Sequence, residues 1–88
     1  MITLVKVKPC GFLTRALGKS VSVDAEPMTV ARLLELLQAR MPASDEPTLS
    51  RANTLVAVNG IEVSALQGEE TALSDNDTVT LIPISHGG

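Results

Sequence analysis

Aromatic residues are almost absent from this sequence, because Phe12 is the only one among its 88 residues. Proteins that bind nucleic acid need a basic surface and commonly stack bases on aromatic side chains. The chain has a formal net charge of −3, so it lacks both features. We therefore expect no direct nucleic-acid partner.

Cysteine and long apolar runs are also scarce. Cys10 is the only cysteine, so no disulfide can form within the chain, and this count fits a reducing cytoplasm. No segment approaches the roughly 20 consecutive apolar residues of a membrane span. Residues 1–8 place lysines among β-branched residues, unlike a signal peptide. We expect a cytoplasmic protein that has no membrane partner.

Recognisable catalytic motifs are missing. The sequence contains no phosphate-binding loop, no Cys/His spacing typical of a metal site, and no nucleophile with a base nearby in sequence. It therefore predicts a protein that is not itself an enzyme and that has no cofactor or metal ion of its own.

Basic residues are confined to the first part of the chain. The last of the seven Lys and Arg residues is Arg51, whereas five of the ten acidic residues follow it. Such an asymmetry bears on partners rather than on fold. We expect the C-terminal part of the chain to meet a basic protein surface.

What the sequence does contain is about 44% hydrophobic residues, enough for the core of one small domain. Runs rich in β-branched residues predict strands at 2–8, 19–24, 54–58, 61–63 and 78–82. Asn59-Gly60 predicts a type I′ hairpin turn, because both central positions of that turn need a positive φ. Gly11 and Gly18 bracket a loop, and residues 42–53 predict a longer one.

One helix is clearly indicated. Thr29 is a good N-cap, and Met28 with Leu33 occupies the positions of a hydrophobic staple. Pro42 predicts that the helix ends near Met41. A single apolar stripe follows the helical spacing at Val30, Leu33, Leu34, Leu37 and Met41. Such a stripe predicts a helix that packs on one face of a mixed sheet, an α+β architecture of the β-grasp type. We expect a domain at 1–82 and a flexible C-terminal tail at 83–88.

Several short motifs are shared with one protein family. They are FLTRALG at 12–18, TVARLLELL at 29–37, VAVNG at 56–60, then Leu73, Asp75, Asp77 and Val79, and finally Pro83, Ser85, Gly87 and Gly88. In this order the sequence resembles the MoaD/ThiS group of ubiquitin-like sulfur carriers over nearly its whole length. The group includes the archaeal small modifiers and the eukaryotic ubiquitin-related modifier.

The resemblance implies a specific chemistry. In this family an adenylyltransferase similar to ubiquitin-activating enzymes uses ATP to adenylate the terminal glycine, here Gly88, and a sulfur donor or sulfurtransferase converts it to a thiocarboxylate. MoaD-like members pass the sulfur to a molybdopterin precursor on the molybdopterin synthase large subunit, and ThiS-like members pass it to thiazole synthesis. Modifier-type members supply sulfur to tRNA thiolation enzymes or are joined to lysines of target proteins.

The tail itself suits such chemistry. Gly87 and Gly88 have no Cβ, so they fit a narrow channel and leave the terminal carbonyl unhindered. Pro83 cannot donate to a sheet ladder, so it indicates where the last strand ends. The six residues from Pro83 onward can extend roughly 20 Å at about 3.3 Å per residue. We expect partner proteins to recognise Ile84, Ser85 and His86.

Other titratable residues have an ordinary structural interpretation beside a functional one. His86 could act as a general base, but an exposed residue recognised by a partner is favoured. Cys10 could form a thioester or bind a metal, but a lone cysteine is more often a small loop or core residue. Asp75 with Asp77 could bind a metal ion, but a solvated turn is favoured, and the same holds for the pair Glu69-Glu70.

Three functions remain open. The first is a sulfur carrier in molybdopterin or tRNA thiolation pathways, and the second is a protein modifier joined to lysines through Gly88. The third is a β-grasp binding module that acts by its surface and has an inert tail. The first two are compatible with each other, because one activated tail can serve both.

Overall fold

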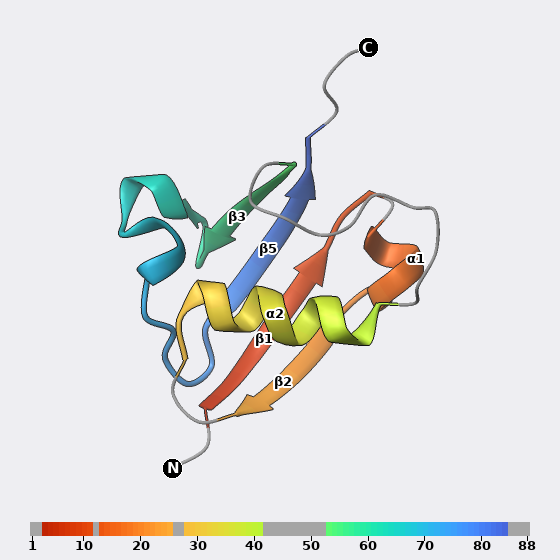
Figure 1. The fold of residues 1–88 in the computed structure, drawn as a ribbon, viewed down its shortest axis with the longest axis horizontal. Helices are drawn as coiled ribbons and strands as arrows, with labels where there is room; N and C mark the ends of the chain where they lie inside the picture. Colours follow the sequence, from red (N-terminus) through yellow and green to blue (C-terminus); the bar gives the residue numbers. More distant parts are fainter. Residues whose placement is uncertain (1–2, 12, 26–27, 42–52, 85–88) are drawn as a thin grey trace.

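The computed structural model describes residues 3–11, 13–25, 28–41 and 53–84. Figure 1 shows a twisted sheet with one long helix lying across one face. The elements in chain order are β1 (Thr3–Pro9), α1 (Leu13–Leu17), β2 (Val21–Ala25), α2 (Val30–Arg40), β3 (Thr54–Val58), β4 (Ile61–Glu62), the 3₁₀ helices η1 (Val63–Ala65) and η2 (Gly68–Glu70), and β5 (Thr78–Pro83).

The sheet is mixed, with the strand order β2-β1-β5-β3-β4. The first and last strands, β1 and β5, run parallel at its centre, whereas the other pairs are antiparallel. Each terminal strand is therefore flanked on both sides, and the chain's last strand is held by β1 and β3 together. This arrangement is the β-grasp that the sequence predicts.

The core lies between the sheet and α2. Alternation along each strand directs every second side chain toward the helix, and α2 contributes the stripe predicted for it. The fully buried members include Val5, Val7, Val30, Leu33, Leu37, Val56, Val79 and Leu81. Fully burying one such aliphatic side chain stabilises the fold by roughly 1.5 to 3 kcal/mol.

The ends of α2 follow the sequence prediction. The Thr29 hydroxyl accepts a hydrogen bond from the Arg32 backbone N–H at 3.3 Å, so Thr29 is the N-cap. The staple residues Met28 and Leu33 are both buried in the core. The helix ends at Arg40, and Met41 has an extended backbone that leads toward Pro42.

A short helix, α1, was not predicted. The sequence predicts a plain loop between Gly11 and Gly18, but residues 13–17 form one helical turn whose Leu13 is fully buried. Gly18 ends the turn with a φ of +86°, and its N–H donates to the Thr14 carbonyl at 2.8 Å. The one-turn spacing of Leu13 and Leu17 was the available signal for this helix.

The turns agree with their sequence motifs. Asn59 and Gly60 have φ values of +51° and +86°, as a type I′ turn requires. Asn76 also has a positive φ, +68°, in the turn before β5. The stretch between β4 and β5 contains the two 3₁₀ helices. The predicted loop at 42–53 lies outside the described residues except for Asn53.

Candidate functional site: the base of the C-terminal tail and the open sheet face

The last strand, β5, leads the chain toward its C-terminus at the same end of the sheet where the parallel strand β1 also ends (Figure 1). The Cys10 N–H donates to the Leu81 carbonyl at 2.9 Å, which joins the end of β1 to β5. On the other side, the Ile84 N–H donates to the Asn53 carbonyl at 2.8 Å, which extends the β3–β5 ladder by one residue. The chain is therefore held from the β1 side up to Leu81 and from the β3 side up to Ile84.

The sequence places the end of the last strand one residue too early. The prediction is 78–82, because proline was expected to release the chain, but β5 includes Pro83, which pairs with Thr54. The backbone N–H and C=O groups of successive residues in a strand point to opposite neighbouring strands. Because Ile84 donates to β3, the nitrogen of Pro83 faces β1, where the chain is turning away at Gly11. The missing N–H of Pro83 therefore breaks no bond to β3.

Four of the predicted site residues, Ser85, His86, Gly87 and Gly88, lie outside the described residues. The fifth, Ile84, is the last residue that the structure describes, and 37% of its surface is exposed. The structure thus shows where the tail starts and what surrounds its base.

An exposed apolar patch lies next to this base, on the sheet face opposite α2. Leu55 of β3 and Ile82 of β5 are direct cross-strand partners, and they are 38% and 41% exposed. Directly opposed antiparallel residues have Cβ atoms about 4.5–5.5 Å apart, so these two side chains are neighbours. Ile84 follows Ile82 by two residues along the same strand direction. We call Leu55, Ile82 and Ile84 the tail-base patch.

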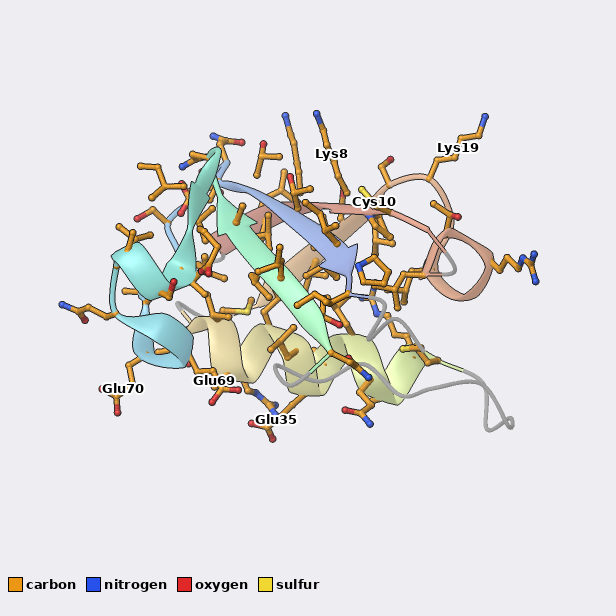
Figure 2. All side chains as sticks on the ribbon, turned by 90° about the horizontal axis from the view of Figure 1, so that it is seen from above. Lys8, Cys10, Lys19, Glu35, Glu69 and Glu70 are labelled. Atoms are coloured by element: carbon orange, nitrogen blue, oxygen red, sulfur yellow. The ribbon has the colours of Figure 1, made fainter. Side chains whose placement is uncertain are left out.

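Two lysines lie on the same sheet face as this patch. Lys6 and Lys8 of β1 are both exposed, and Lys8 pairs with Thr80 of the neighbouring β5. Figure 2 shows Lys8, Cys10 and Lys19 on the side of the sheet that faces away from α2. The open sheet face therefore combines an apolar patch with positive charge.

Four of the five acidic residues of the C-terminal part lie elsewhere, whereas Glu62 pairs with Ala57 and shares the open sheet face. Glu69 and Glu70 lie on the α2 side together with Glu35 (Figure 2). Asp75 and Asp77 lie in the turn before β5, at the opposite end of that strand from the tail. The open face carries both Lys8 and Glu62, so the basic partner surface that the linear count of charges predicts stays a prediction.

Asp75 and Asp77 have structural roles. One carboxylate oxygen of Asp75 accepts a hydrogen bond from the Leu4 N–H at 2.8 Å. The Asp77 carboxylate accepts from the Ser74 N–H at 2.8 Å and from the side-chain amide of Asn59 at 2.9 Å. Within the described part of the chain, no three His, Cys, Asp or Glu residues gather as a metal site would require.

Cys10 is half-buried at the end of β1, on the lysine side of the sheet (Figure 2). Its backbone holds β5, as described above. Sequence reasoning singled out Cys10 but missed Leu55 and Ile82. The signal for them was the alternation in TLVAV and TVTLI, which leaves one large apolar residue of each strand facing away from the core.

Among the described residues, no helix has the length and apolar character needed to cross a bilayer. A comparison with curated proteins found no similar sequence. Solved structures, however, include clear relatives. The small archaeal modifier protein 1 (SAMP1) of Methanosarcina acetivorans is 27% identical with a TM-score of 0.77, over 100% of this chain and 99% of that one.

Two further structures are similar. The Haloferax volcanii HVO 2177 protein is 26% identical with a TM-score of 0.80, over 99% of this chain and 88% of that one. CysO of Amycolatopsis orientalis, solved in complex with BexX, is 29% identical with a TM-score of 0.67, over 96% of this chain and 99% of that one.

These relatives share the β-grasp and almost the whole length of the chain, which confirms the resemblance inferred from the motifs. The model of the ThiS family matches residues 10–88, so the match includes the terminal Gly87-Gly88. On this match the chain belongs to the ThiS family, a family of ubiquitin-like sulfur carriers.

Proposed function

We propose that the chain carries sulfur as a thiocarboxylate on Gly88, in the C-terminal segment 83–88, whose first two residues the sheet still holds. The observation that carries the proposal is a family match that runs through the final two glycines, on a chain whose last strand is anchored beside an exposed apolar patch. The protein acts as a co-substrate of other enzymes. Because the chemistry consumes ATP and yields an oxidisable thiocarboxylate, we assign it to the reducing cytoplasm.

The chemistry proceeds in two steps on the terminal carboxyl group. First, a carboxylate oxygen of Gly88 attacks the α-phosphate of ATP in an adenylyltransferase similar to ubiquitin-activating enzymes, and pyrophosphate leaves. Second, hydrosulfide delivered by a sulfur donor or sulfurtransferase attacks the carbonyl carbon. The C–O bond to the phosphate breaks, AMP leaves with the electron pair, and a thiocarboxylate remains. Glycine at this position leaves the carbonyl open to attack.

The open sheet face gives the partner a place to dock. The tail-base patch offers apolar surface next to the reacting tail, and Lys6 with Lys8 adds positive charge. Apolar surface at the centre of an interface supplies binding free energy, and flanking charges raise the association rate and the specificity. We therefore propose that the adenylyltransferase contacts Leu55, Ile82 and Ile84 and presents carboxylates opposite the lysines.

The sulfur acceptor belongs to one of the pathways that the family serves. We propose a molybdopterin synthase large subunit or a tRNA thiolation enzyme as the protein that receives the thiocarboxylate tail. The relative CysO, solved in complex with BexX, supports the use of a protein partner in general. The chain itself then makes no direct contact with nucleic acid, because only such an enzyme binds the tRNA.

A second candidate function is protein modification. It is favoured by the 27% identity to an archaeal small modifier protein over the whole length of the chain. In this function a target lysine amine replaces hydrosulfide as the nucleophile, so an isopeptide bond forms at Gly88 and AMP leaves as before.

Reconstitution separates these functions. Purified chain is incubated with the adenylyltransferase from the same organism, ATP and sulfide, and its intact mass is measured. A sulfur carrier gains the mass difference between one sulfur and one oxygen atom, and deletion of Gly87-Gly88 abolishes this change. A chain that keeps its original mass, while the enzyme releases no pyrophosphate, would sink the proposal and favour a binding module with an inert tail.

A further inference from the structure

Gly11 and Pro83 meet at the point where the tail leaves the sheet. Gly11 follows the last strand residues of β1, and its φ of +56° lies in the left-handed region. A Cβ atom built on Gly11 would lie 3.2 Å from Cγ of Pro83, closer than ordinary van der Waals contact. The proline ring therefore rests so close to Gly11 that a Cβ atom there would require it to give by a few tenths of an ångström.

Two hydrogen bonds enclose this contact. The Cys10 N–H holds Leu81 from the β1 side at 2.9 Å, and the Ile84 N–H is held from the β3 side by the Asn53 carbonyl at 2.8 Å. Pro83 lies between the two bonded residues of its own strand. A shift of its ring away from Gly11 would thus move the chain toward Asn53 and disturb the last bond of the ladder.

This anchor shortens the reach expected from the sequence. The four residues from Ser85 to Gly88 span at most roughly 14 Å at about 3.3–3.6 Å per residue. The direction in which the chain leaves Ile84 then decides whether Gly88 arrives at a reaction centre, because a short tail cannot correct a wrong starting angle.

We propose that Gly11 is a positioning residue for the reaction at Gly88: by seating the ring of Pro83, it sets the direction in which the tail leaves the sheet. The inference rests on the proposed function for its kinetic consequence, and its structural part stands on the contacts alone. The residue acts through Pro83 and touches neither substrate nor reacting atoms.

The chain contains a closely matched control. Gly68 has a φ of +58°, almost the same as Gly11, but a Cβ atom built there meets nothing within 4 Å. Gly11→Ala and Gly68→Ala therefore introduce the same left-handed strain, about 1–2 kcal/mol, and only the first displaces Pro83. Pro83→Ala removes the ring carbon that Gly11→Ala would strike.

The experiment measures kcat and KM for adenylation of these variants by pyrophosphate exchange. Gly11→Ala is expected to lower kcat by roughly threefold to tenfold, because the contact forces a shift of only a few tenths of an ångström and a misplacement of about 1 Å can cost about 100-fold. Its KM stays within about twofold, because the docking face is unchanged. Gly68→Ala keeps the kcat of the original chain. Equal kcat values for Gly11→Ala and Gly68→Ala would overturn the proposal.

The double variant tests whether Gly11 acts through the ring of Pro83. Adding Gly11→Ala to Pro83→Ala is expected to have no further effect on kcat, because no ring carbon remains to be displaced. A full additional loss in the double variant would contradict the proposal. If Gly11→Ala fails to fold, Pro83→Ala alone must still lower kcat at unchanged KM, and an unchanged kcat overturns the inference.

The exchange rate of the Ile84 amide hydrogen tests the structural part of the inference without any enzyme. The Ile84 amide is expected to exchange faster in Gly11→Ala than in Gly68→Ala, because its bond to Asn53 is weakened. Equal exchange rates overturn the inference even if the chain carries sulfur. If the original chain is never adenylated while the exchange difference is present, the proposed function fails and only the structural part of the inference, that Gly11 seats the ring of Pro83, stands.

Discussion

Leu55 and Ile82 are paired across β3 and β5, and both lie on the sheet face that α2 leaves open. Two residues further along each strand, the Ile84 N–H donates to the Asn53 carbonyl, the last described bond of the β3–β5 ladder. An apolar surface and the start of the tail therefore occupy the same place in the fold. A partner that covers the pair necessarily holds the tail base within its interface.

Replacing both residues of the pair tests this role. Leu55→Ser with Ile82→Ser removes partly exposed side chains whose complete burial in an interface would contribute about 1–2 kcal/mol together. The KM for adenylation should rise roughly tenfold, as that free energy implies, at nearly unchanged kcat. Ile61→Ser is the control, because Ile61 is 50% exposed but lies in the edge strand β4. An equal rise for Ile61→Ser would remove the special role of the pair.

Charge reversal at Lys6 and Lys8 tests the electrostatic part of the interface. Lys6→Glu with Lys8→Glu should raise the KM at low salt, because the association rate depends on complementary charge. The difference should shrink as salt screens the interaction, since the Debye length falls to about 8 Å at physiological ionic strength. Arg32→Glu on α2 is the control, because Arg32 is exposed on the helix. A salt-independent effect would argue against carboxylates on the partner.

Core and open face should respond differently to truncation. Leu37→Ala is expected to cost about 2–5 kcal/mol of unfolding free energy, because Leu37 is fully buried under the sheet. Leu55→Ala should cost well under about 1 kcal/mol, as exposed substitutions generally do. Urea unfolding measures both. A large loss in Leu55→Ala would mean that the pair serves stability rather than docking.

The Asp77 carboxylate should prove to be a structural group. It accepts hydrogen bonds from the Ser74 N–H and from the Asn59 side chain, so Asp77→Ala should lower stability by about 1–3 kcal/mol. Asp75→Ala, which loses the bond to the Leu4 N–H, is the matched comparison. Neither variant should change its melting temperature when Mg²⁺ or Ca²⁺ is added. A metal-dependent rise in the original chain, lost in Asp77→Ala, would contradict this assignment.

Much of the fold could be predicted because its signals are local. The alternation at 54–58, the Asn59-Gly60 turn and the helix stripe with its Thr29 cap each report their own structure. The short helix α1 was missed because one turn has too few residues for a periodicity. The end of the last strand was predicted one residue too early. A proline disrupts a sheet only where its nitrogen faces a hydrogen-bonded neighbour, and the sequence does not show which neighbour the nitrogen of Pro83 faces.

The surface around the tail could not be predicted in the same way. The count of acidic residues after Arg51 is correct as a count, but the fold sends Glu69 and Glu70 to the helix side and brings Lys6 and Lys8 beside β5. Likewise, Gly11 and Pro83 are distant in sequence, and only the parallel pairing of β1 with β5 brings them together.

The most direct test of the central claim is the chemical state of Gly88 in the native organism. The protein is isolated with an N-terminal tag, and its free and conjugated forms are digested with a protease other than trypsin, because cleavage at Arg51 would leave a very long remnant on any target. Mass spectrometry of the C-terminal peptide should find a thiocarboxylate on free Gly88, or Gly88 joined to lysines if the chain also serves as a modifier. An unaltered carboxylate in every fraction would contradict the account.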